Sequence, residues 1–313
     1  MHRVGWFINW GGLLAAIALA SCGSGSSDQT GAAPPPASQS SASAAGKAIF
    51  FDTSLSASGR QSCGTCHVPT RAFTANPATD HGLPVPLGGP NMDQTGFRNA
   101  PSLMYASFTP PFSLTNGPTG GFFRDGRASS LATQAEQPFV TPFEMANQDA
   151  AEVVSRLRNS PATLQAFTAV YGEAALDDPD TALKDMGLAL AAFETEDPSF
   201  HPFSSKYDYW LQGQVQLSAQ EQNGLNLFNN PVKGNCTACH PSQPQGYDSH
   251  ALFTDFTFDN IGIPRNWQIP VRLDQRAART ALVGRKATAL ERRRARLDHG
   301  AVDRNGFCTL FRE

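Results

Sequence analysis

The sequence predicts an all-α fold with long loops, and three observations support this. Apolar residues recur at helical spacing over residues 151–157, 161–171 and 182–193, and no segment alternates like a strand ladder. Two similar apolar segments, residues 46–50 and 224–228, each precede a pair of cysteines. Finally, 40% of the 313 residues are hydrophobic and 16% are charged, which suffices for one or two globular domains.

The composition excludes several classes of protein. It does not fit a chain that is disordered throughout, a collagen or a protein with many membrane spans. The formal net charge of −3 divides into +6 from residue 271 onward and −9 before it. Because phosphate binding needs clustered cationic side chains, the acidic part argues against nucleic acid as a partner.

The amino terminus has the features of an export signal. An apolar stretch over residues 13–19 is far shorter than the roughly 20 residues of a membrane span, and it ends in Leu19-Ala-Ser-Cys22. These four residues resemble a bacterial lipobox, in which Cys22 becomes the lipid anchor; the alternative is an ordinary cleaved signal. We expect residues 1–22 to direct export to the periplasm or cell envelope, and the Gly-, Ser-, Pro- and Ala-rich residues 23–45 to form a flexible linker.

Two segments of the form C-x-x-C-H have the spacing of c-type haem attachment: Cys63-Gly-Thr-Cys66-His67 and Cys236-Thr-Ala-Cys239-His240. Residues i and i+3 of a helix share one face, so both thiols can form thioethers with one porphyrin. The histidine that follows supplies the proximal ligand of the iron. The sequence therefore predicts two covalently bound haem c groups.

Other uses of a cysteine pair fit less well. Half a zinc site, a redox dithiol and a structural disulfide are the alternatives. Zinc needs further ligands, and the remaining histidines form no suitable pattern. A redox dithiol does not require the following histidine, which occurs here twice. We predict two c-type cytochrome-like haem domains, over residues 46–205 and 206–313, and the capping-box pattern Ser218-Ala-Gln-Glu221 predicts the start of a helix in the second.

Several runs between and before the motifs resemble the bacterial dihaem cytochrome c peroxidases and their MauG-like relatives. They are residues 50–56 (FFDTSLS), 96–103 (GFRNAPSL), 123–131 (FRDGRASSL) with Gln134-Ala135, and 142–145 (PFEM). The resemblance implies an enzyme that reduces hydrogen peroxide to water with electrons from a small cytochrome c or cupredoxin, and it allows a homodimer.

The resemblance also implies roles for single residues. The haem at His67 would be the peroxidatic one, with Glu144 and Gln134 on its distal side, and the haem at His240 would receive electrons. A carboxylate there can move protons while the O–O bond breaks, and an amide can orient the peroxide. The alternative for Glu144 is a solvated acid at a helix start. Asn99 matches an asparagine that helps to bind calcium in these peroxidases.

Three arginines lie within the resembling runs, namely Arg98, Arg124 and Arg127. They either pair with haem propionates or form ordinary surface ion pairs. Arg124 stands where many relatives have a tryptophan proposed as an electron bridge between the haems.

The axial ligands depart from the family pattern. Residues 83–96 contain no histidine to cap the first haem, and His81 is the nearest candidate. If it does not coordinate, the first haem stays open, as in MauG-like proteins. No methionine follows His240 to cap the second haem, and Tyr247, His250 and His299 match no family motif.

The carboxy-terminal residues 271–313 form an atypical basic tail. They hold eleven Lys or Arg against five Asp or Glu, and the resemblance fades after about residue 266. The tail is either a basic helix with a solvated face or out-of-frame sequence, in which case the second haem domain is incomplete. The unpaired Cys308 lies within it. Two rivals to a peroxidase remain: a MauG-like oxidase of a partner protein, and a dihaem electron-transfer protein without catalysis.

Overall fold

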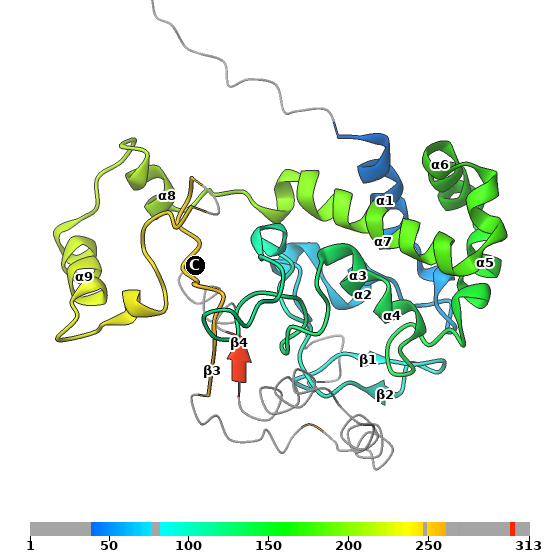
Figure 1. Ribbon diagram of the computed structural model, residues 1–313, viewed down its shortest axis with the longest axis horizontal. Helices are drawn as coiled ribbons and strands as arrows, with labels where there is room; N and C mark the ends of the chain where they lie inside the picture. The colour runs from blue at the N-terminus through cyan, green and yellow to red at the C-terminus, as the bar shows by residue number, and fades with distance from the viewer. Residues whose placement is uncertain (1–38, 77–81, 247–248, 261–268, 270–300, 304–313) are drawn as a thin grey trace, which may run out of the picture. The chain divides into compact units, whose positions relative to one another are not determined.

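A computed structural model describes residues 39–76, 82–246, 249–260, 269 and 301–303, all within one compact unit that starts at Gln39 (Figure 1). The fold is helical with little strand, as the sequence predicts. The α-helices are α1 (Ser41–Phe51), α2 (Cys63–Cys66), α3 (Leu131–Ala135), α4 (Gln137–Val140), α5 (Ala150–Arg158), α6 (Pro161–Tyr171), α7 (Pro179–Glu196), α8 (Lys206–Leu211) and α9 (Ala219–Asn229). Strands β1 (Leu87–Gly88) and β2 (Gln94–Thr95) pair antiparallel, as do β3 (Phe258–Asn260) and β4 (Ala301–Asp303).

Helix α1 begins at Ser41 and so includes the last five residues of the expected linker, 41–45. Ser40 caps it by accepting a 3.1 Å hydrogen bond from the amide of Ser43, and it donates through its own amide and hydroxyl to Glu196 on α7. Ala45 is fully buried. The expectation that the linker reaches residue 45 is therefore wrong, because contacts with a distant helix order a segment whose composition alone suggests a tether.

The centre of the fold is the packing of α1 against α7, with α3, α5 and α6 around them (Figure 1). Gly46 allows this close approach, since a β-carbon there would collide with the carbonyl oxygen of Ala189. The core between these helices is rich in aromatic rings, and its largest fully buried side chains include Phe50, Phe139, Phe167, Phe193, Phe200, Leu157, Met186 and Leu190. This core supports the first cysteine motif.

The helices expected from apolar spacing are present. Residues 151–157 fall in α5, residues 161–171 coincide with α6, and residues 182–193 lie inside the longer α7. Helix α9 starts at the expected capping box, where Ser218 and Glu221 exchange hydrogen bonds.

The segment around the second cysteine motif is joined to the earlier part of the chain by backbone hydrogen bonds. The amide of Gly120 donates to the carbonyl of Phe256 at 2.8 Å, and the amide of Phe258 donates to the carbonyl of Pro118 at 3.2 Å. The expected boundary at residues 205 and 206 lies within the single compact unit, between η5 (Pro198–Phe200) and α8.

Several sequence-based expectations concern residues outside the described ranges. They are the signal and anchor with Cys22, the axial candidates His81, Tyr247 and His299, and most of the basic tail with Cys308. Among the described residues, no helix has the length and apolar character needed to cross a bilayer.

Candidate functional site

The first cysteine motif occupies a single helical turn. The amide of Ser62 donates a 3.0 Å hydrogen bond to the hydroxyl of Thr65, which closes the start of α2, and the amide of His67 donates to the carbonyl of Cys63 at 2.8 Å at its end. Neither Cys63 nor Cys66 is in a disulfide. Both thiols are thus presented from one turn and are available for other chemistry.

The ring of His67 is hydrogen-bonded through Nδ1, which leaves Nε2 for a metal. Its Nδ1 lies 2.9 Å from the carbonyl oxygen of Phe73 and 3.0 Å from that of Pro101. Because both partners are acceptors, Nδ1 must carry the proton, which leaves the lone pair of Nε2 free for a metal. Burial lowers the pKa of His67 and so favours the neutral ring that binds iron.

The second motif repeats this arrangement. The amide of His240 donates to the carbonyl of Cys236 at 2.8 Å, and Nδ1 of His240 lies 2.9 Å from the carbonyl oxygen of Phe253. The motif sits on a 3-10 turn, η6 (Cys236–Ala238), and not on an α-helix. Phe73 and Phe253, which supply the accepting carbonyls, both have left-handed backbones with φ of 55° and 53°. The two histidines are therefore oriented by the same unusual device.

These donor sets fit a covalently attached haem at each motif. Each offers two unbridged thiols three residues apart and a histidine whose Nδ1 is hydrogen-bonded to a backbone carbonyl. Burial, followed by the charge of Glu194, raises the pKa of the Cys63 thiol to about 12, so it is a neutral thiol at physiological pH. Addition of a thiol across a vinyl group consumes that S–H bond.

Glu144 lies in a turn between α4 and α5. Its amide donates to the carbonyl of Thr141 at 2.9 Å, and its side chain is half-buried. Burial raises the pKa of Glu144, while a hydrogen bond from Thr141 and the charge of Arg127 act in the opposite direction. The alternative of a solvated acid at a helix start does not describe it, because α5 begins only at Ala150.

The Glu144 turn lies against the first cysteine motif through the β1–β2 hairpin. A β-carbon on Gly88 would lie 3.0 Å from both the Glu144 Cα and the Nε2 of Gln61, and it would collide with the carbonyl oxygen of Phe143. The same Nε2 donates to the sulfur of Cys66 at 3.4 Å. The charge of Glu144 also contributes to the raised pKa of Cys63. Glu144 is thus close to both thiols that would carry the first haem.

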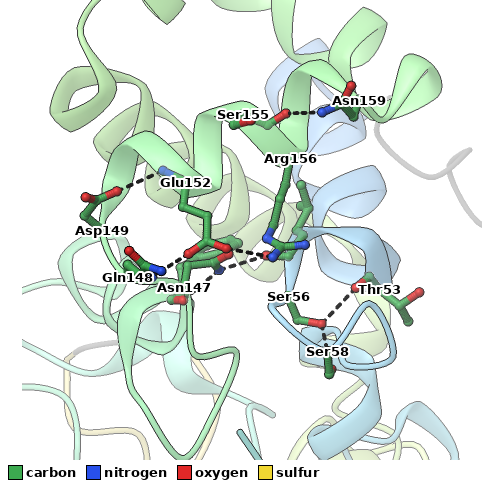
Figure 2. A network of polar contacts seen from close by, with 12 residues as sticks. Thr53, Ser56, Ser58, Asn147, Gln148, Asp149, Glu152, Ser155, Arg156 and Asn159 are labelled. Carbon is green, nitrogen blue, oxygen red and sulfur yellow. Dashed lines mark hydrogen bonds and ion pairs between the residues drawn. The ribbon is translucent and has the colours of Figure 1, made fainter. Parts of the chain in front are cut away.

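A polar network fixes the turn from the other side (Figure 2). The buried amide of Asn147 donates to the carbonyls of Leu55 and Phe139 at 2.9 and 2.8 Å. Next to it in the picture, Glu152 accepts a 2.7 Å hydrogen bond from Arg156. The segment that follows Glu144 is therefore tied through Asn147 to the loop between α1 and α2 and to α4.

The remaining residues singled out by sequence are placed differently. Gln134 is half-buried on α3, and among the described residues no hydrogen bond joins its side chain to Glu144. Arg127 forms two 2.9 Å bonds to Asp125 and stacks over the ring of Phe123 at 3.5 Å, so its exposed guanidinium is in an ion pair within its own loop. Asn99 is exposed.

Two buried polar residues near the first motif were not expected from the sequence. Glu194 on α7 is 5% exposed, its Oε2 has no hydrogen-bond partner, and burial raises its pKa to about 8. Gln61 is 2% exposed, and its Oε1 likewise has no partner. Glu194 had a sequence signal, since helical spacing places it on the same face as the buried Leu190.

Comparison with known proteins identifies relatives of one kind. Residues 40–216 match the family model described as di-haem cytochrome c peroxidase. The chain is 41% identical over 225 residues to the methylamine utilization protein MauG of Paracoccus denitrificans, covering 71% of this chain and 57% of that protein. It is 32% identical over 208 residues to the cytochrome c551 peroxidase of Nitrosomonas europaea, covering 66% and 53%.

A solved structure agrees with these matches. The crystal structure of the diheme peroxidase BthA from Burkholderia thailandensis superposes with a TM-score of 0.66 at 37% identity, covering 75% of this chain and 57% of that one. The chain spans about half the length of the curated relatives it matches.

Proposed function

The chain belongs to the di-haem cytochrome c peroxidase family, and we propose that it is an exported enzyme that reduces hydrogen peroxide with electrons from a small cytochrome c or cupredoxin. The observation that carries this proposal is that Gly88 lies against both the Glu144 turn and Gln61, which donates to Cys66 in the motif where His67 keeps Nε2 for iron. A carboxylate near these cysteines would be suited to proton transfer on the distal side of a haem held by His67.

The first motif would be the peroxide site. A haem c held by Cys63, Cys66 and His67 would supply a redox-active iron. Glu144 takes a proton from one oxygen of the peroxide and delivers it to the other, so that the departing oxygen leaves as water. The half-buried position of Glu144 suits this role, because burial raises the pKa of its carboxyl above that of a solvated glutamate. Gln134 orients the peroxide through its amide.

The second motif would admit electrons. Reduction of one peroxide to two waters consumes two electrons and two protons. The electrons would enter at the haem held by Cys236, Cys239 and His240 and continue to the first site. Export fits this scheme, because small cytochromes and haem attachment belong to the periplasmic side, and Cys22 would anchor the protein by lipid. Asn99 is proposed as one ligand of a calcium ion.

A MauG-like oxidation of a partner protein is the second candidate. It is favoured by the 41% identity to the Paracoccus denitrificans MauG and by the absence of histidine from residues 83–96. A first haem without a sixth ligand reacts with peroxide in the resting enzyme, whereas a capped one must first be reduced.

One set of experiments tests the proposal and separates the candidates. Intact-mass measurement of the exported protein under denaturing conditions should show two covalent haems, and Cys236→Ala with Cys239→Ala should lose one. Peroxide-dependent oxidation of a reduced small cytochrome c should then be followed in resting and pre-reduced protein. Steady turnover supports the peroxidase. Rapid reaction of the resting haem with peroxide but negligible cytochrome oxidation supports the MauG-like candidate, and inertness in both states rejects both.

A further inference from the structure

Three aromatic rings in contact, those of Tyr105, Phe203 and His250, form a row between the segments that orient His67 and His240. Tyr105 and Phe203 pack edge to face with centroids 4.9 Å apart. The ring of Phe203 then stacks on that of His250 at 3.8 Å, with 14° between the planes. The amide of Phe203 also donates a 3.3 Å hydrogen bond to the hydroxyl of Tyr105. The three side chains are therefore in direct contact, without an intervening gap.

One end of this row connects to the first site. The amide of Tyr105 donates a 2.7 Å hydrogen bond to the carbonyl of Phe200, whose ring stacks on that of Phe73 at 4.0 Å. Phe73 supplies the carbonyl that orients His67. Pro101, the second carbonyl partner of His67, precedes Tyr105 by four residues in the same segment.

The other end connects to the second site. His250 precedes Phe253 by three residues, and the carbonyl of Phe253 orients His240. His250 thus belongs to the same segment as the carbonyl that orients His240, and it stacks on Phe203. The stack on Phe203 gives His250 a role that does not depend on coordination of the iron.

Backbone strain coincides with the contact points. Phe73, Tyr105, Phe203 and Phe253 all have left-handed backbones, with φ of 55°, 63°, 42° and 53°. Aromatic residues rarely adopt this conformation, and strained residues persist where the surrounding structure fixes them and tend to mark functional positions. Two of these residues, Tyr105 and Phe203, contribute rings to the row. The other two, Phe73 and Phe253, contribute the carbonyls that orient the histidines.

We infer that Tyr105, Phe203 and His250 are the route by which electrons pass from the haem at His240 to the haem at His67. This inference rests on the proposed function, since it assumes a haem at each motif. One electron leaves the second haem and arrives at the first; no bond of the three side chains forms or breaks, and no proton moves. Contacting π systems couple two redox centres more strongly than a gap or a mismatched aliphatic contact. Arg124, which replaces the bridging tryptophan of many relatives, cannot serve as such a π bridge in the same way.

The test measures electron equilibration between the haems in the absence of peroxide. In the anaerobic, haem-loaded protein, a radiolytic pulse generates methyl viologen radical as the reductant, and absorbance follows the redistribution of the electron. Phe203→Leu should slow redistribution by about tenfold or more, which equals about 1.4 kcal/mol of barrier. Phe203→Tyr keeps the ring and should restore the wild-type rate.

Two further variants complete the design. Phe108→Leu is the matched control: Phe108 packs on the same Phe203 ring at 5.6 Å but does not lie between Phe203 and His250. It should leave the rate unchanged. His250→Leu breaks the stack from the other side and should slow redistribution, which keeps the test decisive if Phe203→Leu does not fold. Spectra and midpoint potentials of both haems should stay constant across the set.

A wild-type rate in Phe203→Leu or His250→Leu, with unchanged haem spectra, overturns the route. Failure of the proposed function has a different signature. If electrons equilibrate between the haems of the wild-type protein through this row but the protein does not react with hydrogen peroxide, the peroxidase function is rejected and the route stands.

Discussion

The amide of Gly89 donates a 2.8 Å hydrogen bond to the carbonyl oxygen of Glu144. The β1–β2 hairpin and the turn that carries the carboxylate are therefore fixed to one another at the first haem motif. In the proposed mechanism proton transfer depends on the placement of Glu144, so small displacements of this hairpin should change reactivity without removing any reacting group.

Gly88→Ala should reduce the rate of reaction with peroxide. The new methyl group would collide with the carbonyl of Phe143 and press on Glu144. We expect a loss of about tenfold, or about 1.4 kcal/mol of barrier, in the second-order rate measured by stopped-flow absorbance, with unchanged haem content. Gly96→Ala is the control, since its β-carbon would be 3.6 Å from the Phe143 ring, an ordinary contact. Equal rates in the two variants would show that the hairpin does not position Glu144.

The peroxide reaction should depend on pH through Glu144. Burial raises the pKa of this carboxyl above 4.5, and only the ionised form accepts a proton. The rate should therefore fall as pH decreases through the raised pKa, at a pH above that expected for a solvated glutamate. Glu144→Gln should react slowly and lose this acid limb in a stopped-flow pH series. An acid limb that persists in the variant assigns it to another group.

Glu194 should make the folded protein less stable as pH rises. Its pKa is about 8 in the folded state and near 4.5 when unfolded. Below both values it is protonated in either state; between them the unfolded chain releases the proton and the folded one retains it, so unfolding becomes more favourable. In Glu194→Gln the free energy of unfolding, measured by denaturant titration, should fall by a few kcal/mol less than in the wild type between about pH 5 and pH 8. The exposed Glu173→Gln should keep the wild-type slope.

Asn147→Ala should destabilise the fold around the site. It removes two hydrogen bonds from a buried amide and leaves the carbonyls of Leu55 and Phe139 without that donor. We expect the free energy of unfolding to fall by about 2 to 3 kcal/mol. Gln148→Ala, at the exposed neighbouring position, should change it by less than about 0.5 kcal/mol. Similar losses in the two variants would rule out a special role for the Asn147 amide.

Much of the helical architecture follows from local sequence patterns. The apolar spacing of α5, α6 and α7 and the capping box at Ser218 are visible in the sequence because each depends on residues a few positions apart. The start of α1 is not visible, because it depends on Glu196 and on close contact with α7.

The site divides in the same way. The cysteines and histidines of the two motifs are found by spacing. The carbonyls that orient the histidines are not, because Phe73 and Phe253 supply them through left-handed backbones that phenylalanine does not signal. Nothing in the sequence around Gln61 and Asn147 indicates that the fold buries them. Glu194 can be noticed, because it is a charged residue within an apolar helical face.

The packing of α1 on α7 has a consequence for the order in which the molecule is assembled. The two helices enclose the core beneath Cys63, yet more than a hundred residues separate them along the chain. A contact between such distant segments forms late, after a large loop has closed. In a chain that emerges amino terminus first, we therefore expect the core beneath the first pair of thiols to stay open until residues 179–196 have emerged.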